Sequence, residues 1–192
     1  MRALVGEADW SWPTGPWTRA NMVSSIDGAA TGSDGLSGSI NNAADRAVFQ
    51  QLREGADAII VGAGTARAEG YRGAGKPLIV IGHSIPAELA DAEGVRLRPG
   101  GDAEALRTLI AELHSEGLTR LLTEGGPSLL GDLVRAGLVD ELCLTFTPHL
   151  VAGDGRRIVG GPLAEVPLEL SALVEIDSTL ISRWLVGRPS GS

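Results

Sequence analysis

The sequence has 192 residues, a formal net charge of −8 at pH 7 and one cysteine, Cys143. A chain of this length is typical of one domain that needs no disulfide or metal to hold its core together. The acidic balance argues against nucleic acid as a partner, because phosphate backbones are bound by basic surfaces. No apolar run reaches the ~20 residues of a membrane span, and the N-terminus lacks the features of a signal peptide. We therefore expect a cytoplasmic protein without membrane association, in which Cys143 is a small core residue.

The first residues of the chain mix tryptophans with proline and glycine. This composition predicts a weakly structured lead-in over residues 1–16 that wraps the surface or a partner subunit. A first strand is expected over Trp17–Ile26, and the following Gly, Ser, Thr and Ala residues up to Ser39 predict a loop. We expect one domain over residues 17–188 and a short tail over 189–192.

From residue 41 onward, helical periodicity alternates with short apolar runs that are typical of buried strands. Four helices are predicted. The first begins at the capping residues Asn41 and Asn42 and ends at Gly55, and the second covers Ala66–Glu69. The third begins after Asp102 and ends at Gly117, and the fourth runs from Pro127 to Ala136. The predicted strands are Ala58–Val61, Pro77–Ile81, an edge strand at Val95–Arg98, and Thr119–Thr123. Beyond residue 138 the sequence predicts strands with no helix between them, at Val139–Thr147, Glu169–Ile176 and Thr179–Val186. This pattern indicates an α/β fold whose mostly parallel central sheet is flanked by helices and extended by antiparallel C-terminal strands.

Two glycine-containing junctions follow predicted strands, Gly62-Ala-Gly-Thr65 and Glu124-Gly-Gly-Pro-Ser128. At the carboxyl edge of a parallel sheet, their uncovered amides could meet a pyrophosphate, whereas a single Gly-x-Gly is equally compatible with a tight turn. No Gly-Lys-Ser/Thr follows either junction, and Arg67 stands where a Rossmann fingerprint has its third glycine. The next strand ends at His83 and Ser84 and has no acid there, which favours NADP over NAD.

Five motifs, in this order and spacing, carry a family resemblance: Ser25-Ile-Asp-Gly28, Ser37-Gly-Ser-Ile-Asn41, Leu52-Arg53, Val61-Gly-Ala-Gly-Thr65 and Thr123-Glu-Gly-Gly126. Together they resemble the reductase domain of the riboflavin-biosynthesis deaminase/reductase family over residues 17–186. The resemblance implies a dihydrofolate-reductase-like fold, NADPH as cofactor and a homodimer. It also implies reduction of a ribosylamino-pyrimidine phosphate to its ribitylamino product, the substrate being the aminouracil or its 2,5-diamino-pyrimidinone counterpart. The zinc-deaminase pattern of the other half of that family is absent from this sequence.

The resemblance also assigns roles to individual residues. Expected cofactor contacts are Val23, Ser39, Gly62, Gly64, Thr65, Glu69, Ser84, Gly125, Gly126, Pro127, Ser128, Leu129 and Leu130. Expected substrate contacts are Asn21, Ser37, Asn41, Arg53, Arg72 and Glu124. The candidate proton donors are Glu69, Glu124 and, as a weaker choice because Asp-Gly is common in turns, Asp27. Arg53 would meet a phosphate or carboxylate, unless it only complements the end of its helix.

Three departures from the family pattern border the expected substrate. Asn21 stands where lysine is usual, Asn41 where threonine is usual, and Glu69-Gly-Tyr-Arg72 where Asp-Asn/Asp-Pro-Ser is usual. Two alternatives therefore stay open, a dihydrofolate or pterin reductase and a non-catalytic NADP-binding protein. The three histidines are scattered through the sequence, and we predict no metal site.

Overall fold

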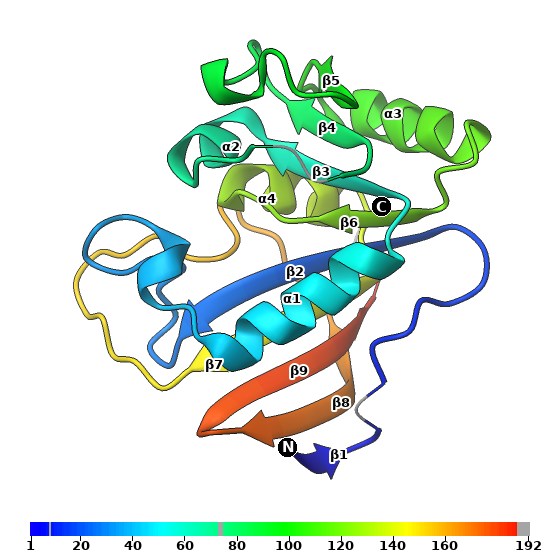
Figure 1. The fold of residues 1–192 in the computed structure, drawn as a ribbon. Helices are drawn as coiled ribbons and strands as arrows, with labels where there is room; N and C mark the ends of the chain where they lie inside the picture. The colour runs from blue at the N-terminus through cyan, green and yellow to red at the C-terminus, as the bar shows by residue number, and fades with distance from the viewer. Residues whose placement is uncertain (8, 73–74, 188–192) are drawn as a thin grey trace.

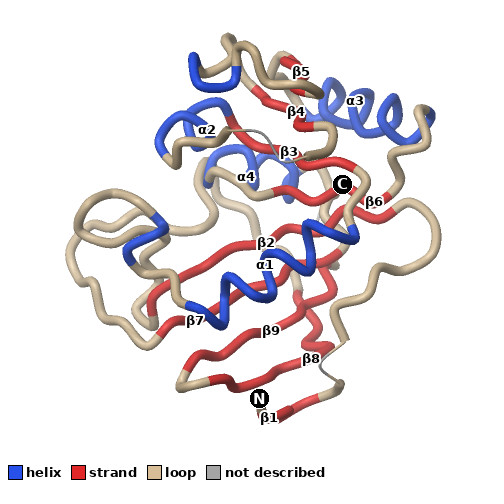
Figure 2. The backbone as a smooth tube through the Cα atoms, in the orientation of Figure 1, coloured by secondary structure: helices blue, strands red, loops and turns tan. Residues whose placement is uncertain are grey.

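One mixed sheet runs through the computed structural model, which describes residues 1–7, 9–72 and 75–187; the predicted tail 189–192 lies outside them (Figures 1 and 2). Its strands are β1 (Arg2–Val5), β2 (Trp17–Ser25), β3 (Ala58–Gly62), β4 (Leu78–Ile81), β5 (Val95–Arg98), β6 (Arg120–Thr123), β7 (Glu141–Thr147), β8 (Leu168–Ile176) and β9 (Thr179–Val186). The α-helices are α1 (Ala43–Gly55), α2 (Ala63–Ala68), α3 (Ala103–Ser115) and α4 (Pro127–Arg135), with short 3₁₀ turns η1 (Ser37–Ser39) and η2 (Ala87–Leu89).

The strand order is β1-β8-β9-β7-β2-β6-β3-β4-β5. Strands β7, β2, β6, β3, β4 and β5 pair in parallel, whereas β9, β8 and β1 extend the sheet through antiparallel pairs. The predicted parallel sheet with antiparallel C-terminal strands is confirmed, and Val95–Arg98 is an edge strand as expected.

Helices cover the two faces of the sheet in a way that follows from strand alternation. Ala58 and Ile60 of β3 pack in the cluster that includes α3 and α4, whereas the alternate residues Ile59 and Val61 pack in the cluster that includes α2. Leu122, opposite Ile59 in the register, packs with α1. Because successive side chains point to opposite faces of a strand, β3 is buried on both sides, as its apolar run predicted.

Local capping signals predicted the helix starts well. The Asn42 side chain accepts a hydrogen bond from the Asp45 amide at the start of α1, and the Asp102 carboxylate accepts from the amides of Glu104 and Ala105 at the start of α3. Helix α2 differs from the prediction, because it begins at Ala63, three residues earlier than expected. The glycine junction is therefore itself the first turn of that helix.

The weak structure expected for the lead-in is wrong at two places. Arg2–Val5 form the edge strand β1, which pairs with β8 although all four residues are exposed. Trp10 is buried against α1 and the sheet. Cys143 is a buried, free core residue, as predicted.

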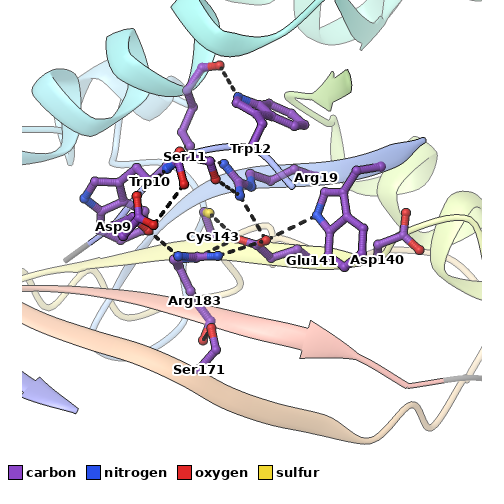
Figure 3. Close-up of polar contacts among 12 residues, drawn as sticks. Asp9, Trp10, Ser11, Trp12, Arg19, Asp140, Glu141, Cys143, Ser171 and Arg183 are labelled. Atoms are coloured by element: carbon purple, nitrogen blue, oxygen red, sulfur yellow. Dashed lines mark hydrogen bonds and ion pairs between the residues drawn. The ribbon is translucent and has the colours of Figure 1, made fainter. Parts of the chain in front are cut away.

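A buried ionic cluster fastens residues 9–12 to the sheet (Figure 3). The Arg19 side chain is fully buried, and its Nη2 donates to Glu141 Oε2 at 3.0 Å. Arg19 also donates to the carbonyls of Trp10 and Ser11, at 3.1 and 2.9 Å. Arg183 Nε completes the cluster by donating to Glu141 Oε1 at 2.8 Å. Glu141 therefore neutralises two guanidinium groups and fixes the segment that they bind.

Replacing Glu141→Gln should destabilise the protein by about 3–5 kcal/mol, because removal of one partner leaves buried charge without compensation. The free energy of unfolding, measured by urea denaturation, tests this. The matched control is Glu116→Gln, which breaks the exposed ion pair with Arg96 and should cost about 1 kcal/mol or less. Equal losses for the two variants would contradict the role given to the cluster.

Asp57 gives the fold a predictable response to acid. Its Oδ1 accepts from Arg120 and its Oδ2 from the amides of Thr119 and Arg120, which joins the start of β3 to β6. The Asp57 pKa is lowered to about 2, and the hydrogen bond from the Arg120 side chain makes the largest contribution. Ionised Asp57 therefore stabilises the folded state fully at pH values above the ordinary aspartate pKa. This stabilisation is lost as the pH falls from about 4 to about 2. The free energy of unfolding of the wild-type protein should exceed that of Asp57→Asn by about 1–2 kcal/mol at pH 6. This difference in the free energy of unfolding should disappear near pH 2.

Candidate functional site

A cavity of about 580 Å³ opens at the carboxyl ends of the central parallel strands, between β2, α1 and the loop after α2. Ten of the residues predicted for cofactor, substrate or catalysis line it: Asn21, Val23, Ser37, Asn41, Arg53, Thr65, Glu69, Arg72, Glu124 and Gly126. Two loops also contribute: the loop over residues 29–39 through Ala30, Ser37 and Gly38, and the loop over residues 70–76 through Gly70, Tyr71 and Arg72. We expect these two covering loops to shield the site. Residues of four of the five family motifs thus converge on one cavity, and the motif Ser25-Ile-Asp-Gly28 contributes none.

The two glycine junctions lie side by side, as predicted. Strands β3 and β6 are parallel neighbours, and the Gly62 amide donates to the Gly125 carbonyl at 2.8 Å. A Cβ added to Gly126 would lie 2.2 Å from Thr65 Oγ1, so the second junction has no room for a side chain where it faces the first. The Thr65 side chain occupies this space, which explains why glycine stands at position 126.

A second cavity of about 500 Å³ lies at the start of α4. Pro127 and Ser128 line it, together with Arg156 and Arg157 from the long loop after β7. Gly126 lines the first cavity and Pro127 the second, so both cavities border the start of this helix. The sequence analysis did not single out Arg156 or Arg157, since the loop has no periodic pattern that would place it against α4.

An ion pair and a tyrosine organise the wall of the main cavity. Arg53 Nε and Nη2 donate to Glu124 Oε1 and Oε2, both at 2.6 Å, and the Tyr71 hydroxyl donates to Oε2 at 2.5 Å. The Arg53 guanidinium also lies 4.3 Å from the centre of the Phe49 ring. Burial acts to lower the Arg53 pKa, but the Glu124 carboxylate outweighs it and the pKa is raised. Arg53 is therefore far more than a solvated last-turn arginine, and its first partner is a carboxylate of the protein itself.

Tyr71 and Phe49 were missed by the sequence analysis. Tyr71 was named only within the segment Glu69-Gly-Tyr-Arg72 and was given no role of its own, yet its side chain packs against Arg53 and Glu124. Burial, followed by the Glu124 carboxylate, raises the Tyr71 pKa well above its ordinary value. The available signal was a lone aromatic residue in an otherwise small and polar segment.

Glu69 links the two covering loops. Its Oε1 accepts a hydrogen bond from the Ser37 amide at 2.9 Å, and the residue lines the cavity. No described residue bonds to Glu69 Oε2. This leaves one carboxylate oxygen of Glu69 available at the cavity.

Asp27 lies outside the main cavity. It accepts hydrogen bonds from the Ser25 hydroxyl and from the amides of Val151 and Ala152. These contacts lower the Asp27 pKa to about 2, and the hydrogen bond from the Ser25 hydroxyl makes the largest contribution. Because these contacts hold Asp27 outside the main cavity, the structure does not support Asp27 as a proton donor.

The remaining predicted residues lie around the rim or in the core. Ser39 is exposed and donates to Asp34 and to the Leu36 carbonyl, while the side chains of Leu129 and Leu130 pack in the core. Ser84 lies after β4 and accepts a hydrogen bond from Arg67 at 3.5 Å. Any ligand contact by Leu129 or Leu130 would therefore have to come from the backbone at the start of α4.

Within residues 1–7, 9–72 and 75–187, no group of three or more His, Cys, Asp or Glu side chains could hold a metal ion. In the same part of the chain, no helix is long and apolar enough to cross a membrane.

Comparison with protein families gives one match that spans most of the chain. The model of the RibD C-terminal domain matches residues 16–84 and 103–182. The riboflavin biosynthesis protein RibD of Corynebacterium ammoniagenes is 31% identical over 170 residues, which is 82% of this chain and 50% of that protein. The chain thus spans about half the length of the RibD proteins it matches first. A 2,5-diamino-6-ribosylamino-4(3H)-pyrimidinone 5′-phosphate reductase of Archaeoglobus fulgidus is 25% identical over 190 residues, covering 76% of this chain and 87% of that enzyme.

Solved structures show the same fold. A pyrimidine reductase-like protein of Corynebacterium diphtheriae superposes with a TM-score of 0.76 at 26% identity, over 90% of this chain and 92% of that one. Dihydrofolate reductase of Enterococcus faecalis superposes with a TM-score of 0.57 at 15% identity, over 88% and 96% of the two chains. The predicted dihydrofolate-reductase-like fold is therefore confirmed.

Proposed function

Because this chain belongs to the family of RibD C-terminal domains, we propose that it is an NADPH-dependent reductase of a ribosylamino-pyrimidine phosphate in riboflavin biosynthesis. The observation that carries the proposal is the convergence of both glycine junctions and the Arg53–Glu124 pair on one cavity. The family resemblance alone would not require these groups to meet. Their meeting provides a cofactor wall and a substrate wall within a single cavity.

The residues present fit a dinucleotide phosphate at the start of α4. Any side chain at position 126 would fill the space beside Thr65, and the first N–H groups of a helix, which have no partner within it, suit an anion. Arg156 and Arg157 add positive charge beside Pro127 and Ser128, which answers how an acidic protein can hold an anion. NADPH bound there would supply the hydride, while the protein supplies position and protons.

The region beyond β4 offers hydrogen-bond donors for a 2′-phosphate. Arg67 and Ser84 approach each other there, and both are exposed donors at the same edge of the sheet. An acid that would pair with the free ribose hydroxyls of NAD is missing from this position. This arrangement supports NADPH over NADH.

On the substrate side, Arg53 holds the Glu124 carboxylate in place as a hydrogen-bond acceptor. Both oxygens of Glu124 already accept bonds from Arg53 and Tyr71, so we assign Glu124 to orienting the donor groups of the substrate. Glu69 has a carboxylate oxygen without a partner among the described residues, and it is our candidate for the proton that assists opening of the ribosylamine. Ser37, Asn41 and Arg72 line the same cavity and are assigned to polar groups of the substrate, with Arg72 suited to its phosphate.

The purified protein should oxidise NADPH, followed at 340 nm, when a 5-phosphoribosylamino-pyrimidine is added, and the ribitylamino product should form in equal amount. Dihydrofolate serves as the comparison substrate. Turnover of dihydrofolate alone would favour the pterin-reductase alternative. Persistent absorbance with every acceptor in single-turnover mixing would favour a non-catalytic NADP-binding protein.

Replacing Gly126→Asp should weaken NADPH binding by about 100-fold, because a carboxylate would both crowd Thr65 and repel the phosphates. Gly126→Ala is the matched control, since it adds the crowding without the charge and should weaken binding by about tenfold or less. Dissociation constants from fluorescence titration, with thermal unfolding to show that both variants fold, test this. Unchanged affinity in folded Gly126→Asp would refute the placement of the diphosphate.

A further inference from the structure

The motif Ser25-Ile-Asp-Gly28 carries part of the family resemblance, yet none of its residues lines either cavity. Its Asp27 side chain reaches a segment that is distant in the sequence. The Asp27 carboxylate accepts hydrogen bonds from the backbone amides of Val151 and Ala152, at 3.1 and 2.7 Å, in the loop after β7. The Ser25 hydroxyl donates to the same carboxylate at 2.6 Å. Asp27 therefore joins the loop after β2 to the loop after β7.

Two backbone contacts fasten the same loops together on either side of Asp27. The Ile26 amide donates to the His149 carbonyl at 3.0 Å. The Ala30 amide donates to the Arg156 carbonyl at 2.6 Å. Ala30 lines the main cavity and Arg156 lines the second cavity, so this contact joins the walls of the two cavities.

The Asp27 contacts also hold an uncommon backbone conformation. Ala152 has a φ of 58°, in the left-handed region that favours glycine. Its amide donates to Asp27 Oδ2 at 2.7 Å. A non-glycine residue keeps this conformation only where its surroundings hold it. Asp27 is thus placed to fix the path of the chain four residues before Arg156.

Helix α4 holds the other end of the loop after β7. The Gly160 amide donates to the Pro127 carbonyl at 2.9 Å, and Arg135 Nη1 donates to the Gly160 carbonyl at 3.3 Å. The loop is therefore fixed at both ends. Between these ends, Arg156 and Arg157 line the second cavity beside the start of α4.

The guanidinium groups of Arg156 and Arg157 are available to a ligand. Both residues are exposed, and neither guanidinium has a hydrogen-bond or ion-pair partner in the described part of the chain. Ser128, in the first turn of α4, lines the same cavity. Two adjacent cations beside the start of a helix form a local surface for an anion, although the whole chain has a formal net charge of −8.

We propose that Asp27 is a positioning residue for cofactor binding, which holds the loop after β7 so that Arg156 and Arg157 meet the phosphates of NADPH at the start of α4. The inference rests on the proposed function, which places these phosphates there. It gives Asp27 a role that requires neither proton transfer nor contact with a ligand. Without the Asp27 carboxylate, one end of the loop is released and has to be ordered when the cofactor binds, which lowers the affinity.

The first test is Asp27→Asn, which leaves one oxygen to accept from two amides and a hydroxyl. We expect the Kd for NADPH, measured by fluorescence titration, to rise about tenfold. The kcat at saturating NADPH and the KM for the pyrimidine should change by less than about twofold, because Asp27 lies outside the main cavity. An unchanged Kd in folded Asp27→Asn would overturn the inference.

The matched control is Asp57→Asn. Asp57 also accepts from two backbone amides and a hydroxyl, but it lies just before β3, at the end of the strand away from the cavities. This variant should lose stability without any change in the Kd for NADPH. If both variants weakened NADPH binding equally, the effect of Asp27 would be a general loss of structure and the inference would be wrong.

The second test is a double-mutant cycle with Arg156→Gln/Arg157→Gln. Loss of both charges should raise the Kd for NADPH by about 10- to 100-fold and make it less sensitive to ionic strength. In this background, Asp27→Asn should raise the Kd by less than about twofold, because its effect passes through the two arginines. Additive effects would overturn the inference. The arginine variant changes only exposed side chains, so unchanged affinity in it would overturn the inference even if Asp27→Asn did not fold.

Binding and turnover together separate failure of the inference from failure of the proposed function. If NADPH binds to the wild-type protein and is oxidised by the pyrimidine, but the substitutions act additively, only the inference is wrong. If the substitutions are non-additive in NADPH binding but no pyrimidine is reduced, the proposed reaction fails and the role of Asp27 stands. If the wild-type protein does not bind NADPH, both are wrong.

Discussion

The parallel pairing of β3 with β6 is the constraint on which the site depends. It brings together two strand ends that are more than 60 residues apart, and the Gly62–Gly125 hydrogen bond continues the ladder into the junctions themselves. Because carboxyl ends of parallel strands share one edge, each junction supplies one wall of the same cavity. The burial of β3 on both faces holds this register, since a shift by one residue would exchange its two core faces.

Two arginine–glutamate clusters show how position decides the role of one interaction. The Arg19–Glu141–Arg183 cluster lies beside residues 9–12, as Figure 3 shows, and its guanidinium groups donate to protein carbonyls and to the Glu141 carboxylate. The Arg53–Glu124 pair has shorter contacts, at 2.6 Å, but Arg53 is 25% exposed and both residues line the cavity. The first cluster therefore serves the fold, whereas the second remains open to a ligand.

Local signals were sufficient where the physics is local. The cap at Asn42, the cap at Asp102 and the proline at the start of α4 each satisfy or spare backbone amides within one turn, so sequence alone placed these helices. The edge strand β1 has no such signal, because its four residues are exposed. It forms by pairing with β8, where Arg2 lies opposite Glu175, far away in the sequence. Tyr71 was missed for the same reason, since its partner Glu124 lies 53 residues away.

The sequence by itself determined the alternation of helices and strands, the two glycine junctions, the family and most of the residues that line the cavity. These follow from periodicity, from the conformational freedom of glycine and from motif order, all of which are written along the chain. Only the tertiary structure decided how those residues are used: Arg53 is engaged by Glu124, and Asp27 lies outside the cavity, where it accepts from backbone amides of the loop after β7. Hydrogen-bond satisfaction depends on every neighbour in space, and a linear pattern names the groups without showing which of them remain free.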